Sequence, residues 1–77
     1  MEVKVLGTGC AKCKTTYEKV QKVLVDNNVN ADLTKEENIL EILKYNIMSL
    51  PAIVINGEVK LKGYVPTEEE IKNALNL

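Results

Sequence analysis

The sequence predicts a single α/β domain, residues 1–77, with the element order βαβαββα and a four-stranded mixed sheet in the order 2-1-3-4. Three observations predict this fold: short apolar segments separate stretches of helical periodicity, an Asn-Gly pair lies late in the chain, and no linker or repeat interrupts the 77 residues. A right-handed crossover makes the first two strands parallel, and a hairpin makes the last two antiparallel. The helices are expected on both faces of the sheet.

The first half of the chain predicts a strand, a helix and a second strand. Residues 3–6 are typical of a short strand that ends at Gly7. A helix is predicted over residues 11–26, because apolar side chains recur there at helical spacing: Tyr17, Val20, Val23 and Leu24. Residues 29–33 alternate between apolar and polar, which indicates a half-buried strand.

The second half begins with a helix over residues 36–45, whose inner stripe is formed by Ile39, Ile42 and Leu43. Glu36 and Glu37 are placed in its first turn, where the helix dipole favours negative charge. Residues 52–55 are continuously apolar, as expected of a strand that is buried on both faces.

The chain closes with a hairpin, a strand and a helix. Asn56-Gly57 predicts a type I′ turn, because both residues tolerate a positive φ. Residues 58–62 then alternate, so that the last strand has one face in water. Thr67 followed by three glutamates, the last of them Glu70, has the pattern of a capping box.

The composition excludes several functional classes. The chain carries a formal charge of −1 and no histidine. Every cation is a lysine, so a basic nucleic-acid face is not expected. Without histidine there is no Cys-His or Ser-His nucleophile pair and no imidazole metal ligand. The longest apolar stretch, residues 50–55, is too short for a membrane span, and the amino terminus lacks a signal-peptide pattern. We therefore expect a cytoplasmic monomer with no nucleic-acid or membrane partner.

The two cysteines lie where the first strand meets the first helix. Two residues separate Cys10 from Cys13, so both sulfurs can meet across one helical turn. A helix amino terminus favours thiolate over thiol, and Lys12 and Lys14 act in the same direction. Cys13 shares a helix face with the apolar positions and should point to the core. Cys10 is then expected at the exposed tip as the nucleophile, with Cys13 resolving the mixed disulfide.

Other uses of the same spacing stay open. A closed zinc site needs two further ligands, which the chain does not offer as Cys or His. Two thiolates could instead hold Cu(I) or bind zinc across a dimer, or the pair could be structural or accidental. No resident metal or cofactor is expected.

Three segments resemble the thioredoxin/glutaredoxin superfamily, and in particular its very small bacterial and archaeal redox-active disulfide proteins: residues 3–13, residues 49–57, and Gly63. The resemblance covers essentially the whole chain. It implies a thioredoxin-like fold and a protein-disulfide reductase that exchanges a Cys10–Cys13 dithiol with a protein partner and is re-reduced by an unidentified reductase. It also implies that Pro51 is cis and lies against the cysteine pair.

The implied substrate-binding residues are Lys12, Leu50, Pro51 and Gly63. The Leu50 backbone would offer its N–H and C=O to an extended partner strand, and Gly63 would leave room beside the sulfurs. Met48, Tyr17 and Tyr64 are further candidates for the substrate surface, with core or rim filling as the alternative.

The chain departs from the family pattern in three places. Gly9 stands where thioredoxins have a tryptophan, Lys4 stands where they carry a buried acid, and Ser49 begins a loop that lacks the glutathione marks of glutaredoxins. Two other functions compete with the reductase. One is a soft-metal carrier, whose domains have the order βαββαβ, and the other is a redox-regulatory binding module.

Overall fold

Four strands form one mixed sheet in the order β2-β1-β3-β4. The structure, a computed structural model, describes residues 1–9 and 11–77. Its elements are β1 (Glu2–Leu6), α1 (Ala11–Asp26), β2 (Asp32–Glu36), α2 (Ile39–Leu43), β3 (Ala52–Ile55), β4 (Glu58–Lys62) and α3 (Glu68–Ala74). The predicted element order and strand order are both confirmed.

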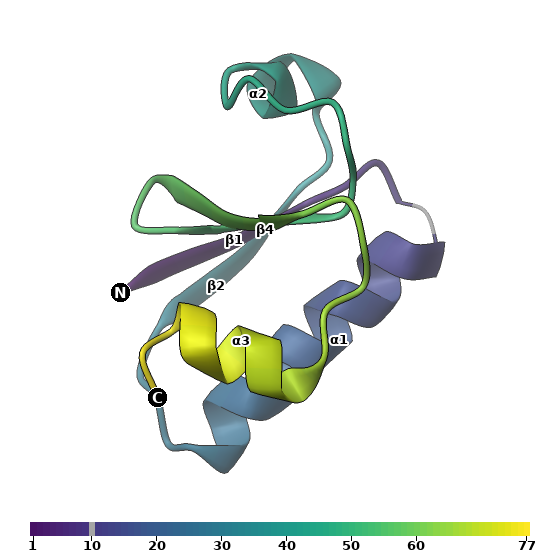
Figure 1. Ribbon diagram of the computed structural model, residues 1–77. Coiled ribbons are helices and arrows are strands. Elements are labelled where there is room, and N and C mark those ends of the chain that lie inside the picture. Colours follow the sequence, from purple (N-terminus) through teal and green to yellow (C-terminus); the bar gives the residue numbers. More distant parts are fainter. Residues whose placement is uncertain (10) are drawn as a thin grey trace.

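The pairing of the strands brings four chain segments to one end of the sheet. β1 runs parallel to β2 and antiparallel to β3, and β3 is antiparallel to β4. At one end, Leu6 pairs with both Glu36 and Ala52, and Ala52 pairs with Lys62. Thus β1, β2 and β4 all end where β3 begins. We call this end of the sheet, at which the strand termini meet, the site edge; the term does not refer to an edge strand. It lies on the right of the sheet in Figure 1.

Helices cover both faces of the sheet, as predicted. α1 and α3 lie together on one face, and α2 lies on the other (Figure 1). β3 is buried on both faces because its side chains alternate between two cores. Ile53 and Ile55 join the core under α1 and α3, whereas Ala52 and Val54 join the core under α2. In the described part of the chain, no helix is both long enough and apolar enough to cross a membrane.

The second strand begins three residues later than predicted. The strand was predicted over residues 29–33 because apolar and polar residues alternate there. Val29 and Ala31 do pack against the core under α1 and α3, which is the larger of the two cores. The ladder itself starts at Asp32, which pairs with Glu2. Residues 29–31 therefore form the segment that leads into β2. Their burial does not make them a strand, because their backbone is not paired with β1.

The second helix is shorter than predicted. It begins at Ile39 because the side chain of Asn38 accepts a hydrogen bond from the N–H of Leu40 at 2.9 Å. Glu36 belongs to β2 and Glu37 precedes the helix, so neither lies in its first turn. Of the predicted inner stripe only Ile42 is buried, while Ile39 and Leu43 are about half exposed, because a helix of five residues presents less than two turns to the sheet.

The last hairpin and the last helix follow the prediction. Asn56 and Gly57 have φ values of 51° and 84°, as a type I′ turn requires. Thr67 caps α3: its hydroxyl accepts from the N–H of Glu70 at 3.1 Å, and its own N–H donates to the Glu70 carboxylate at 3.0 Å. α3 then buries Ile71 against the larger core.

Replacing Thr67→Ala should lower the free energy of unfolding by about 1 kcal/mol, because it removes the side-chain half of the capping box. Urea denaturation followed by circular dichroism measures the loss. Glu69→Gln is the matched control in the same helical turn, since Glu69 makes none of the hydrogen bonds of the box. Equal stability of T67A and the parent chain would contradict this role for the cap.

Candidate functional site

The site edge gathers three of the segments that the sequence singled out. Gly7 follows β1, Pro51 precedes β3, and Gly63 follows β4. The Leu6–Ala52 pair places the end of β1 beside the beginning of β3. The N–H of Gly63 donates to the carbonyl of Pro51 at 2.9 Å, which joins the third segment to the second.

Cys13 lies in the first turn of α1 and is buried, with 4% of its surface exposed. It shares the inner face of the helix with Val20 and Leu24, so the prediction that it points to the core is confirmed. Cys10, which the sequence predicts as the exposed nucleophile, lies outside the described residues. The structure therefore positions one sulfur of the pair.

Gly7 makes the burial of Cys13 possible. A methyl group on Gly7 would lie 2.5 Å from Cβ of Cys13 and closer still to its sulfur. Only a glycine leaves room for the helix to approach the end of β1 so closely. From the sequence, Gly7 was predicted only to end a strand and not to be a site residue. The available signal was a glycine between the strand and the cysteine pair.

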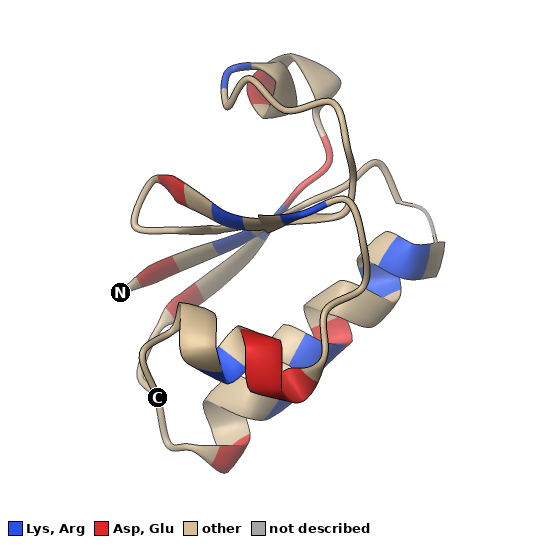
Figure 2. Cartoon of the chain, in the orientation of Figure 1, with Lys and Arg blue, Asp and Glu red and all other residues tan. Residues whose placement is uncertain are grey.

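The beginning of α1 is positively charged. Lys12 and Lys14 are exposed there, and the first turn contains no acidic residue. Figure 2 shows the basic start of α1, whereas the acidic start of α3 lies alongside a later part of the same helix, where Lys22 and Glu68 form a salt bridge of 3.2 Å. One carboxylate comes near this region: a methyl group on Gly9 would lie 3.2 Å from Oε2 of Glu37. The position of this acid was not predicted from the sequence, because Glu37 was expected inside the second helix.

The segment before β3 contains the cis proline that the resemblance implied. The Leu50–Pro51 peptide bond is cis, and Pro51 is buried. Leu50 is half-buried. Among the described residues, neither its N–H nor its C=O takes part in a backbone–backbone hydrogen bond. Within residues 1–9 and 11–77, this polar backbone pair at the site edge therefore has no backbone partner.

Gly63 lies against this segment and has a φ of 87°, which side-chain-bearing residues rarely adopt. A methyl group there would lie 3.3 Å from Cβ of Ser49, tighter than an ordinary van der Waals contact. The glycine thus allows the end of β4 to lie close to the segment before β3.

Tyr64 follows Gly63 and is tied to α3. Its hydroxyl donates to Oε2 of Glu70 at 2.5 Å. This hydrogen bond is the main cause that raises the pKa of Tyr64 above its ordinary value and lowers the pKa of Glu70 below its own. The backbone bond from Thr67 lowers the pKa of Glu70 further.

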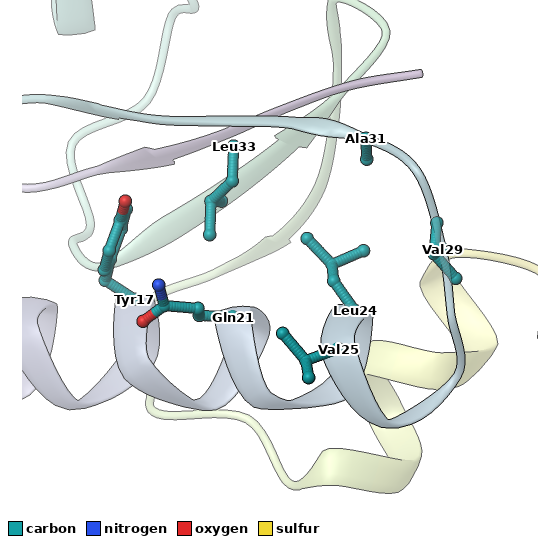
Figure 3. A pocket seen from close by; sticks show the side chains of 7 residues that line it. All are labelled: Tyr17, Gln21, Leu24, Val25, Val29, Ala31 and Leu33. Atoms are coloured by element: carbon teal, nitrogen blue, oxygen red, sulfur yellow. The ribbon is translucent and has the colours of Figure 1, made fainter.

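A cavity of about 310 Å³ lies between α1 and the approach to β2, away from the site edge (Figure 3). It is lined by Tyr17, Gln21, Leu24, Val25, Val29, Ala31 and Leu33. Lys35 lies over the ring of Tyr17, 5.0 Å from its centroid. Tyr17, one of the further candidates for the substrate surface, therefore lines this cavity, whereas Lys12, Leu50, Pro51 and Gly63 do not.

Comparison with known proteins identifies the family. The model of the thioredoxin domain family matches residues 1–76. The chain belongs to the thioredoxin family. It is 30% identical over 76 residues to a thioredoxin of Methanothermobacter thermautotrophicus, with 99% of each chain covered. It is 32% identical over 73 residues to a thioredoxin of Methanocaldococcus jannaschii, covering 95% of this chain and 84% of the relative.

Membership settles the general chemistry, because thioredoxins are thiol–disulfide oxidoreductases. The observed order βαβαββα also differs from the βαββαβ order of the soft-metal carriers considered above. No comparison supports that alternative.

Replacing Gly7→Ala should lower the free energy of unfolding by about 1–3 kcal/mol, since the added methyl group collides with Cys13. Urea denaturation measures the change. Gly57→Ala is the control: its methyl group meets nothing within 4 Å. Its cost is only that of a positive φ, about 1 kcal/mol. If G7A is no less stable than G57A, the close approach of Gly7 and Cys13 is refuted.

The Tyr64 phenol should titrate above its ordinary pKa, and Glu70→Gln should bring that pKa back towards the ordinary value. The neutral phenol is the donor, so the bond stabilises the fold at neutral pH and is lost as the pH rises through the raised pKa. On the acid side, the contribution of Glu70 is present above the ordinary glutamate pKa and is lost as the pH falls through its lowered pKa. Ring NMR signals followed against pH measure the titration.

Tyr17→Phe is the control for this titration, because it removes a different phenol and should leave that of Tyr64 unchanged. An identical Tyr64 titration in E70Q and the parent chain would show that the hydrogen bond is absent in solution.

Proposed function

We propose that this chain reduces disulfides of a protein partner through Cys10 and Cys13. The observation that carries the proposal is the buried Cys13 in the first turn of α1, held against Gly7 at the same site edge as the cis Leu50–Pro51 bond. A resolving sulfur has to be shielded from outside disulfides yet stay within reach of Cys10, three residues earlier in the chain. The burial of Cys13 supports this role.

The exchange proceeds in two balanced steps. The Cys10 thiolate attacks one sulfur of the partner disulfide, forms a mixed disulfide and releases the other partner sulfur as a thiolate. Cys13, after losing its proton to solvent, attacks the Cys10 sulfur, forms the intramolecular disulfide and releases the second partner thiolate. Two electrons pass to the partner, whose two thiolates take up protons from water. A dithiol reductase then returns two electrons to the pair.

The charges at the start of α1 support a reactive thiolate. The amino terminus of a helix of sixteen residues and the exposed Lys12 and Lys14 all favour negative charge on a nearby sulfur. The Glu37 carboxylate near Gly9 acts in the opposite direction. The balance of these groups would set how oxidising the pair is.

The partner is proposed to bind as an extended segment. The N–H and C=O of Leu50 are available for strand-like hydrogen bonds with a partner backbone. Gly63 keeps the space beside Pro51 free of a side chain, and Lys12 is exposed at the rim. A reducing compartment such as the cytoplasm would return the pair to its dithiol form.

Cys10→Ser should abolish the reduction of insulin disulfides by dithiothreitol that this chain catalyses, because the attacking thiolate is lost. Cys13→Ser should instead accumulate mixed disulfides with the partner, because the resolving step is blocked. Insulin turbidity measures turnover, and non-reducing electrophoresis with mass spectrometry measures the trapped adducts.

Thr15→Ser is the matched control on the same helix, since it keeps the exposed hydroxyl that bonds to the Ala11 carbonyl. It should turn over insulin at the parental rate. The proposal fails if C10S retains the parental rate, or if C13S traps no partner while C10S is inactive.

A further inference from the structure

Tyr64 lies beside the segment that is proposed to bind the partner. It follows Gly63, whose N–H bonds to the Pro51 carbonyl at 2.9 Å and whose α-carbon faces Ser49. On the other side of Ser49, Met48 is 96% exposed. In Figure 1 the chain before β3 and the chain after β4 run side by side at the site edge. The two neighbouring segments, before β3 and after β4, therefore each carry an exposed large side chain, Met48 and Tyr64.

The ring of Tyr64 is exposed but held in place. It is 44% exposed, yet its hydroxyl is bonded to Oε2 of Glu70 at 2.5 Å. The other carboxylate oxygen of Glu70 accepts from the N–H of Thr67 at 3.0 Å, so Glu70 is itself fixed by the capping box. A ring that is ordered before binding loses little conformational entropy when a partner covers it.

The other aromatic side chains are engaged elsewhere. The chain contains three tyrosines and no tryptophan or phenylalanine. Tyr17 lies beneath Lys35 and lines the cavity beside α1, and Tyr45 packs against the core under α2. Tyr64 is thus the aromatic side chain that is exposed at the site edge.

We propose that Tyr64 determines specificity: its ring contacts an apolar side chain next to the reactive cysteine of an extended protein disulfide. This inference rests on the proposed function and names the substrate class, protein disulfides with an apolar flanking residue. Glu70 is a positioning residue that acts through Tyr64. Because the contact forms only with a flanking side chain, it should change KM for such substrates and leave the exchange chemistry unaltered.

The test compares three disulfides: the disulfide-linked dimer of the peptide Ala-Leu-Cys-Ala, the matched dimer of Ala-Ser-Cys-Ala, and hydroxyethyl disulfide, which has no flanking residue. The parent chain should reduce the leucine peptide with a kcat/KM about tenfold above that for the serine peptide, as expected for one well-packed contact. Tyr64→Ala should bring this ratio close to one by raising KM for the leucine peptide. Its rate with hydroxyethyl disulfide should stay parental.

Two further variants distinguish the positioning of the Tyr64 ring from the stability of α3. Tyr64→Phe keeps the ring but loses the bond to Glu70, so the ratio should fall only part of the way. Thr67→Ala weakens the cap of α3 but keeps the Tyr64–Glu70 pair, so it should keep the parental ratio.

The inference is overturned if the parent chain shows no preference for the leucine peptide over the serine peptide, or if Y64A keeps that preference. It is also overturned if Y64A slows the reduction of hydroxyethyl disulfide as much as that of the leucine peptide. In those cases a parent chain that still reduces hydroxyethyl disulfide leaves the proposed function standing. A parent chain that reduces none of the three disulfides overturns both.

Discussion

The close contact between the Gly7 backbone and the Cys13 side chain determines how the first helix meets the sheet. Because a methyl group on Gly7 would lie 2.5 Å from Cβ of Cys13, the start of α1 sits directly on the end of β1. The same helix face then continues into the core through Val20 and Leu24. One contact thus sets both the burial of the sulfur and the position of the helix amino terminus at the site edge.

The mixed direction of the strands completes the site. β3 begins where β1 ends because the two strands are antiparallel, and the Leu6–Ala52 pair therefore brings Pro51 beside the segment that leads to the cysteines. β4 returns to the same edge after its hairpin, so that Gly63 reaches the Pro51 carbonyl. An all-parallel sheet would place the beginning of β3 at the opposite end.

The start of α3 connects local helix stability to the site edge. Glu70 receives the N–H of Thr67 with one oxygen and the hydroxyl of Tyr64 with the other. Both bonds favour the ionised carboxylate and lower its pKa. The last helix is therefore anchored to the loop that carries Tyr64, and the loop in turn lies against the segment before β3.

Local patterns determined most elements of this protein. The sequence alone predicted α1, the doubly buried β3, the Asn-Gly turn and the capping box, because each depends on neighbouring residues. The element order follows from these elements, and the strand order was predicted from the handedness of the crossover and from the hairpin. It also predicted that Cys13 faces the core, since helical spacing decides the face. Only the tertiary structure decided where β2 begins, because strand pairing with Glu2 overrides the alternation of residues 29–33. Likewise, the roles of Gly7 and Glu70 come from contacts with Cys13 and Tyr64, which no local pattern encodes.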